Sequence, residues 1–315
     1  METLDALNSH IKPGKFMKLY QLQRTALLVL LATCTGPTIQ RAEAATNVVV
    51  WDTISPIADS IHIENRTAWK VVPSDLFLLE SDPLKAASDP GYYGRGYTFK
   101  GDAVVENCHL TAVFWAAQGR VVIYPNADAA QPRDGSPGRK IVALTPLLAK
   151  TQPTRISHYE ILRNAYDEVS LEVSFSTKNP VGTRSTVSEH AADVAAQFSF
   201  DKTEIVEIKP AENMKGMSLL SSIEYGVVPS FIGDDLIFGG AGFPSAKTLC
   251  IPSENIFLGL LTGEDRELVM TWPKGKQQLK LNLGYEKQGK RTIESIDFEN
   301  DGQSFYLATL GAPGI

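Results

Sequence analysis

The histidines are the side chains in this sequence best suited to acid/base chemistry near neutral pH. Those that follow residue 45 are widely separated, and none shows the HxH or HxxxH spacing that is typical of a metal site. Two stand near acidic residues, His109 close to Glu106 and His158 beside Tyr159 and Glu160. We therefore take His109 and His158 as candidate catalytic residues, with a structural role as the alternative. The full set is His62, His109, His158 and His190.

A second group of residues suits carbohydrate binding. The stretch "DPGYYGRGYTFKGD" at 89–102 places tyrosines and an arginine among glycines. Tyrosine rings offer a pyranose flat apolar faces with a polar rim, and a guanidinium can bind a uronate carboxylate or a sulfate. The alternative is a turn in which the tyrosines pack inward and the arginine is solvated. A tryptophan at a strand end, before Pro273, is expected to reach the surface. The candidate sugar-binding residues are Tyr92, Tyr93, Arg95, Tyr97 and Trp272.

The stretch "GDDLIFGGAGFP" at 233–244 has the glycines of a dinucleotide loop but not its helix. Phe243 and Pro244 follow the glycines, so no helix N-terminus is there to hold a pyrophosphate, and a turn is the better interpretation. Neighbouring Asp234 and Asp235 point to opposite faces of a strand. Asp235 could still face a cleft shared with Glu254, which makes Glu254 a third candidate catalytic residue.

The stretch "DFENDG" at 297–302 begins like a calcium-binding loop, with acidic residues at alternate positions before a glycine. The twelfth position is Ala308, where an EF-hand needs a bidentate glutamate, and the flanking residues alternate as in strands. A hairpin turn is therefore favoured. The sequence also lacks the G-x-S-x-G, P-loop and HExxH patterns. We expect no metal and no cofactor.

Composition and charge argue against two classes of partner. The formal net charge is −6, the isoelectric point is near 5.5, and no stretch gathers lysines and arginines, so we expect no nucleic-acid partner. The mean hydropathy of −0.09 argues against a multi-span membrane protein, and we expect no integral membrane span.

Residues 17–44 have the features of a signal peptide. Lys18 and Arg24 precede an apolar run at 26–32, and Ala42-Glu43-Ala44 suits signal peptidase. We expect residues 1–16 to lie upstream of the true start and the mature chain to be exported to the periplasm, the cell surface or the medium. The alternative is lipidation at Cys34, but the preceding Thr33 departs from the small residue usual at such a site.

Removal of the signal leaves Cys108 and Cys250. These two cysteines could form one disulfide in an oxidising compartment. They lie in separate apolar stretches, however, and buried free cysteine is a common core residue, so free and buried thiols are favoured. Neither belongs to a CxxC pair.

Alternation of apolar and polar residues is the clearest structural signal. In "VSLEVSFS" at 169–176 the apolar side chains fall on one face, as they do in "QLKLNLG" at 278–284. The phase shifts in "RTIESIDFE" between Ile293 and Ile296, which indicates a β-bulge. Closely spaced turn signals, with "NDG" at 300–302 among them, predict a β-meander in the last third.

On the order of eighteen strand candidates and few helices predict an all-β protein, a large antiparallel β-sandwich over residues 45–315. In strand number and length the pattern resembles the β-supersandwich of galactose-mutarotase-like domains, which accompany many glycosidases and polysaccharide lyases. That resemblance implies a fold and assigns no site residue. The chain leaves its final strand candidate shortly before Ile315, so we expect a further C-terminal module in a longer protein.

Three functions follow from this pattern. The first is an exported module for carbohydrate recognition or scaffolding in a polysaccharide-processing protein. The second is an epimerase, lyase or glycosidase that uses a histidine and a carboxylate, so the pattern leaves open whether the protein is an enzyme. The third is a non-catalytic protein of the cell surface with exposed sheet edges.

Overall fold

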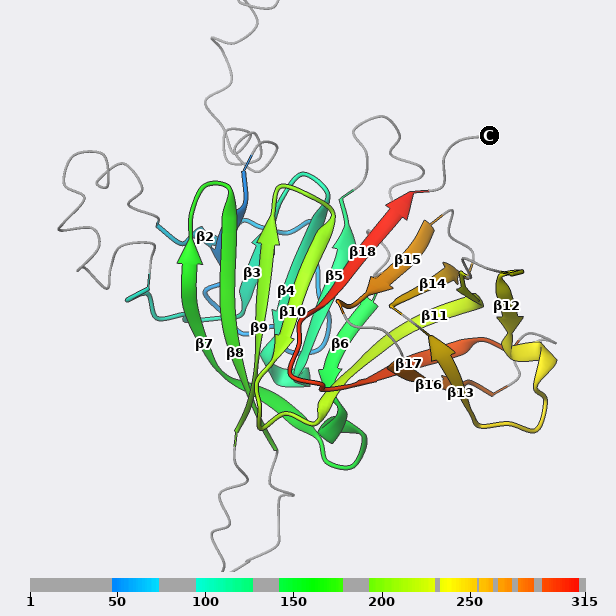
Figure 1. Ribbon diagram of the computed structural model, residues 1–315. Helices are drawn as coiled ribbons and strands as arrows, with labels where there is room; N and C mark the ends of the chain where they lie inside the picture. The colour runs from blue at the N-terminus through cyan, green and yellow to red at the C-terminus, as the bar shows by residue number, and fades with distance from the viewer. Residues whose placement is uncertain are drawn as a thin grey trace, which may run out of the picture. The chain divides into compact units, whose positions relative to one another are not determined.

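The computed structural model describes residues 47–73, 95–126, 142–177, 193–229, 233–253, 255–262, 266–273, 277–285 and 291–311. These residues form antiparallel strands and short 3₁₀ turns, which confirms the predicted all-β class (Figure 1). Ala44–Ile315 form one compact unit. The elements are β1 (Val49–Asp52), β2 (Lys70–Val71), β3 (Ala103–Glu106), β4 (Leu110–Trp115), η2 (Ala116–Gln118), β5 (Arg120–Pro125), β6 (Val142–Pro146), η3 (Leu147–Lys150), β7 (Thr154–Asn164), β8 (Glu168–Thr177), β9 (Val194–Asp201), β10 (Ile205–Pro210), β11 (Gly216–Val228), β12 (Leu236–Gly239), η4 (Gly240–Gly242), β13 (Thr248–Ser253), β14 (Ile256–Leu261), β15 (Arg266–Thr271), β16 (Gln277–Leu283), β17 (Ile293–Glu299) and β18 (Phe305–Gly311).

Hydrogen-bonded pairing arranges the strands in two layers that share β11. The first runs β2, β1, β3, β4, β5, β6, β11, β17, β16 and β13. The second runs β7, β8, β9, β10, β18, β15, β14, β11 and β12. The first half of β11 lies between β6 and β17, and its second half lies between β14 and β12. The long strand β11 therefore joins the layers of the sandwich.

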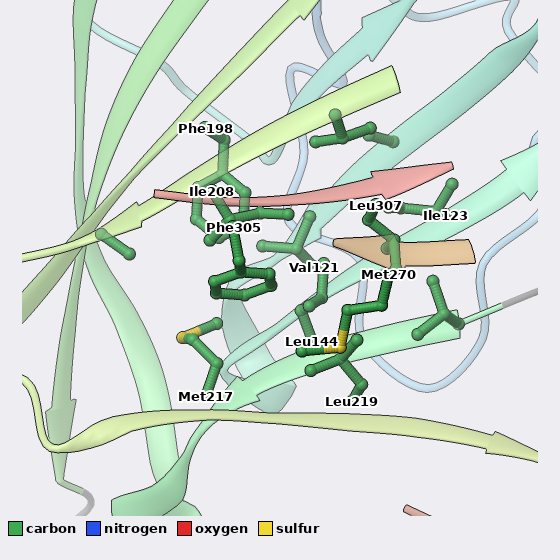
Figure 2. Close-up of a cluster of buried hydrophobic side chains, with 14 of the residues drawn as sticks. Val121, Ile123, Leu144, Phe198, Ile208, Met217, Leu219, Met270, Phe305 and Leu307 are labelled. Carbon is green, nitrogen blue, oxygen red and sulfur yellow. The ribbon is translucent and has the colours of Figure 1, made fainter. Parts of the chain in front are cut away.

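The inner faces of the two layers form the hydrophobic core (Figure 2). Val121 and Leu144 of the first layer lie opposite Met270 and Leu307 of the second. Phe114 of β4 packs edge to face against Phe198 of β9, with ring centroids 5.5 Å apart. Such contacts across the sandwich explain why one side of most strands is apolar.

The predicted alternation is confirmed in β8 and β16. Val169, Leu171, Val173 and Phe175 are all buried in β8, while the serines and glutamate between them, apart from Ser170, remain partly exposed. The predicted bulge is confirmed in β17. There Asn282 pairs with Ser295 but the next residue, Leu283, pairs with Ile293, so one residue of β17 is unpaired in this ladder.

The predicted meander in the last third is wrong. Among the described strands, β17 pairs with β11 and β16, whereas β18 pairs with β10 and β15. The stretch "NDG" is therefore a connection between non-paired strands, and Gly302 supplies the left-handed conformation with φ of 81°. Turn chemistry predicts where a strand ends but does not specify which strand it pairs with.

A smaller hydrophobic cluster lies on the outer face of the first layer. Its centre is Trp51, Val104 and Val113, and the segment 53–69 covers it. The covering apolar side chains include Ile57 and Trp69. Strands β3 and β4 are thus buried on both faces, which agrees with the nearly continuous apolar sequence of "LTAVFW".

We expect Phe114→Ala to destabilise the fold by about 3–5 kcal/mol, because the ring is fully buried between the layers and its removal leaves a cavity. The free energy of unfolding in urea measures this loss. Tyr285→Ala is the control, since its side chain is 86% exposed and a surface change of this kind shifts stability by only about 0.5 kcal/mol. Similar losses in both variants would contradict this assignment of the core.

Candidate functional site

The described part of the stretch at 89–102 is tied into the fold. Tyr92 and Tyr93 lie outside the described residues. Arg95 is exposed, and its Nε donates to the Leu162 carbonyl of β7 at 3.1 Å. Tyr97 is partly buried and donates its hydroxyl to Asp52 Oδ2 at 2.8 Å, so it closes a turn against β1. For Tyr97, the inward-packing alternative agrees with the structure.

Asp52 is a buried carboxylate at the end of β1 that accepts four hydrogen bonds. The N–H groups of Ile54 and Gly101 donate to Oδ1, at 2.8 and 2.9 Å. The Lys100 N–H and the Tyr97 hydroxyl donate to Oδ2. Burial acts to raise the pKa of Asp52, but these donors together outweigh it and hold that pKa below its usual value. The same arrangement raises the pKa of Tyr97 to about 12, through burial and its bond to Asp52.

Asp102, at the start of β3, is a second buried carboxylate in the same region. The Ala116 N–H donates to its Oδ1 at 2.9 Å, and the Ile57 N–H donates to its Oδ2 at 2.6 Å. The Tyr159 hydroxyl of β7 lies between Asp102 Oδ1, at 3.1 Å, and the Phe114 carbonyl, at 2.8 Å. Burial raises the pKa of Asp102 despite these donors. Asp52 and Asp102 thus fasten both the segment 53–69 and the turn before β3, which is a structural role.

The expected surface position of Trp272 is wrong. Its side chain is 1% exposed and packs against Phe298, with ring centroids 5.5 Å apart. Trp272 directly follows β15 and is the next inward-facing residue after Leu268 and Met270. The alternation of β15 therefore determines the position of the ring, and the nearby proline and lysines do not bring it to the surface. A buried ring is not accessible to a sugar.

His109 lies beside a carboxylate, but not the one expected. Its Nδ1 is 3.3 Å from Glu204 Oε1, and both side chains are about two-fifths exposed, at 41% and 39%. The expected partner Glu106 instead forms an ion pair with Arg66 of the covering segment, at 2.5 Å. Proximity in the sequence was misleading because Glu106 is the last residue of β3, whereas His109 lies in the β3–β4 turn, next to the β9–β10 turn.

Asn107 is the residue that brings His109 and Glu204 together. Its side-chain amide donates to the carbonyls of Asp201 and Thr203, at 2.7 and 2.8 Å, which joins the β3–β4 turn to the β9–β10 turn. Its Oδ1 accepts the N–H of His109. Lys202 of the same turn lies over the Tyr166 ring, 5.1 Å from its centroid. The β3–β4 and β9–β10 turns together thus present a histidine and charged side chains on the surface.

The two other described histidines, His62 and His158, are both exposed. His158 is exposed on β7 opposite Ser174, and its neighbour Tyr159 turns inward to Asp102. His62 is exposed and lies 2.8 Å from the Ser60 hydroxyl. His190 and Glu254 lie outside the described residues.

The acidic residues of "DFENDG" are engaged with the protein. Lys150 and the Ser218 hydroxyl both contact the Asp297 carboxylate, at 2.5 and 2.9 Å. Asp301 Oδ1 accepts the N–H of Gln303. Across the described ranges, no three histidine, cysteine or acidic side chains gather in a way that could hold a metal ion.

Both cysteines are free, as expected, but their predicted burial is wrong. Cys108 lies in the β3–β4 turn, where its Sγ is 3.7 Å from the Lys202 carbonyl. Cys250 lies on the exposed side of β13, opposite Lys280 of β16. Apolar neighbours in the sequence do not imply burial in a turn, or at alternate positions of a half-exposed strand.

An aromatic corner, which we define as Phe243, Tyr285, Arg291 and Glu294, lies where η4 meets the end of β16. The Arg291 guanidinium donates to the Gly284 carbonyl at 2.7 Å, to the Pro244 carbonyl at 2.9 Å, and also to the carbonyls of Phe243 and Ala246. Arg291 thus clamps two turns that are distant in sequence. The turn predicted for 233–244 is confirmed as η4.

The clamped turns expose two rings. Tyr285 is 86% exposed and Phe243 is 38% exposed. The Glu294 carboxylate lies directly against Gly284, where a Cβ would collide with Glu294 Oε1. The sequence pointed to 89–102 because tyrosines cluster there, whereas the turns that carry Phe243 and Tyr285 are brought together by folding alone.

No protein-family model matches this chain, and the search of curated proteins returned no match. Within the described ranges, no helix has both the length and the apolar character that a bilayer span requires. The geometry of the chain itself therefore carries the functional argument.

We expect Asp52→Asn to destabilise the protein by about 3 kcal/mol at pH 7, because the amide places N–H groups against donors that need a carboxylate oxygen. An unfolded aspartate has a pKa near 3.9, and the folded pKa of Asp52 is lower. The stabilisation by ionised Asp52 is therefore complete above the unfolded pKa and is lost as pH falls through the folded one.

Urea unfolding of both proteins at neutral and acidic pH measures this effect. The stability difference between them should shrink in acid. Asp102 has a raised pKa and therefore affects stability with the opposite pH dependence. Because Asp102 is present in both proteins, its contribution largely cancels in the stability difference. A difference that stays constant with pH would show that the charge of Asp52 contributes nothing.

Proposed function

We propose that this protein is an exported β-sandwich module that binds a neutral polysaccharide through the aromatic corner. The observation that carries the proposal is that Tyr285, 86% exposed, and Phe243, 38% exposed, stand on two turns that Arg291 clamps together. An apolar ring held in water is suited to stacking on the C–H face of a pyranose, and a clamped site loses little entropy on binding.

The surrounding charges favour a neutral sugar. The Glu294 carboxylate beside Gly284 can accept hydrogen bonds from sugar hydroxyls. The guanidinium of Arg291 is engaged by backbone carbonyls, so it is poorly placed to bind a uronate or a sulfate. Exposed Asp234 and Asp235 precede β12 and add further negative charge. An anionic polysaccharide would meet this charge, together with the net charge of −6.

We expect Tyr285→Ala and Phe243→Ala each to weaken binding to a neutral polysaccharide by about tenfold or more, since stacking of one ring contributes about 1–2 kcal/mol. Affinity electrophoresis against a panel of neutral, amino and acidic polysaccharides measures the effect. Tyr166→Ala is the matched control, because Tyr166 is 55% exposed but stacks with Lys202.

Binding that is lost in the control but kept in the corner variants would refute the aromatic corner as the site. Binding that depends on Tyr92 or Tyr93 would return the site to 89–102, as the sequence predicts. An absence of binding across the panel would refute the carbohydrate function.

The distance of 3.3 Å between His109 and Glu204 favours a second candidate, an enzyme that acts on a sugar. Glu204 would orient the imidazole, whose Nε2 would then exchange a proton with the substrate. We expect His109→Gln and Glu204→Gln to abolish any activity of the protein on a polysaccharide, in assays of reducing ends and of unsaturated products. Activity that survives both substitutions would exclude this pair.

A further inference from the structure

The outer face of the second layer is polar in one half and mostly apolar in the other. On β8 and β9 the outward residues are polar, with Ser170, Glu172, Gln197 and Ser199 among them. From β10 to β12 most outward residues are apolar, with Glu207 and Lys209 of β10 and Glu267 and Thr271 of β15 as polar members. The sequence "IFLGLL" of β14 has no polar residue, a pattern typical of strands that are covered on both faces.

Strand register shows how these side chains are arranged. One outward residue from each of six adjacent strands falls in a single cross-strand row, which we call the apolar row. The ends of the row are exposed, at 63% and 46%, and its central members are partly exposed. The apolar row is Ile237, Val227, Leu258, Val269, Ala308 and Ile205.

The flanking positions extend this face. Tyr225, Leu260 and Leu310 lie in the next row on one side, together with Glu267. Ile256, Thr271 and Tyr306 lie in the row on the other side, together with Glu207. The inward residues of the same strands, such as Phe257 and Met270, are fully buried, so this face is additional to the core.

In the first layer, an apolar outer face of this kind is covered by another part of the chain. The outer face of β1, β3 and β4 is also apolar, and there the segment 53–69 covers it. Arg66 bound to Glu106 and Trp115 bound to the Ile57 carbonyl hold that cover in place. The apolar row is exposed by comparison, and burying a face of this kind is favourable by about 25 cal/mol per Å².

We propose that the apolar row is the centre of a dimer interface, in which a second copy of this chain packs face to face on β11, β14, β15 and β18 (Figure 1). Twisted sheets complement one another in this way, and the core of this protein is built by the same packing (Figure 2). The row has aliphatic side chains and no aromatic ring, which suits sheet packing better than sugar stacking. Its strands from β11 to β18 are paired on both sides, so an added strand has no access to their backbone.

The dimensions of the face agree with a dimer. Six strands at about 4.8 Å spacing, each with up to three outward positions about 7 Å apart, cover on the order of 500 Å² in plan. The accessible area of a surface formed by side chains exceeds its plan area, so each copy would bury close to the roughly 800 Å² of a standard interface.

Two-fold symmetry also keeps the carboxylate of Glu267, on the Tyr225 flank, away from the same carboxylate of the second copy. A two-fold axis that lies in the interface along the apolar row exchanges its two flanks. Glu267 of one copy then faces the flank of the other copy that carries Thr271, a hydroxyl that can donate to the carboxylate. The two Glu267 side chains are kept apart, and Glu207, which lies opposite Tyr306 on the Thr271 flank, is two strands away from the position that Glu267 of the other copy faces.

Sedimentation of the purified protein, from about 1 to 100 µM, tests the proposal over the range of a weak to moderate dimer. We expect a dimer whose dissociation constant rises by at least about 100-fold in Leu258→Glu and in Val269→Lys, since each buries an unpaired charge. Ser174→Glu is the control, because it places a charge on the polar part of the same layer. Circular dichroism and urea unfolding at low concentration establish that each variant still folds.

Two outcomes would overturn the dimer. A monomer at every concentration would exclude a second copy as the occupant. A dimer that both charged variants leave intact would place the contact on another face. If Leu258→Glu unfolds the protein, Val269→Lys alone decides between these results, and Leu258→Gln provides a milder substitution at the first position.

Discussion

Two buried carboxylates hold together the part of the fold in which β1, β3, β4 and β7 meet. Asp52 and Asp102 accept backbone N–H groups from residues on either side of the layer, so each replaces several water contacts by protein donors. Burial of an ion without such donors is strongly unfavourable. The covering segment 53–69 therefore depends on these two side chains, and the outer surfaces of β3 and β4 depend in turn on that cover.

The molecule places its exposed groups in three separate regions. Hairpin ends carry His109, Glu204 and Lys202, an outer sheet face carries the apolar row, and clamped turns carry Phe243 and Tyr285. Each region rests on rigid strands, and each suits a different kind of partner: a reacting sugar, a second sheet and a stacked pyranose. A binding module that also dimerises would present two copies of its aromatic corner, which raises the avidity for a repetitive polymer.

Local pattern was sufficient to predict the fold class. The alternate burial of Val169, Leu171, Val173 and Phe175 on β8 and the bulge in β17 both follow from the alternation of apolar and polar residues. Pairing could not be predicted in the same way. The connection at Gly302 looks like a hairpin in sequence, but β17 and β18 do not pair with each other: β17 pairs with β16 and the distant β11, and β18 pairs with β10 and β15. Such choices depend on the packing of whole layers.

The candidate site was harder to predict for the same reason. Tyr97 was identified as a tyrosine in a loop, but its hydroxyl is bonded to Asp52. His109 was identified for its neighbour Glu106 and instead meets Glu204. The aromatic corner gave no local signal at all, because Arg291 joins residues near 243 to residues near 284. Side chains that meet across long stretches of chain are not visible to reasoning from spacing.

The position of β18 has a consequence for how the protein folds. This strand lies between β10 and β15. β10 ends at Pro210 and β15 ends at Thr271, so both are complete well before β18 begins at Phe305. Until residues 305–311 are in place, both neighbours present open edges and the second layer remains in two parts. The chain must close this long loop before the two parts of the second layer are joined, so folding is expected to be slow and to finish only after synthesis of the whole domain.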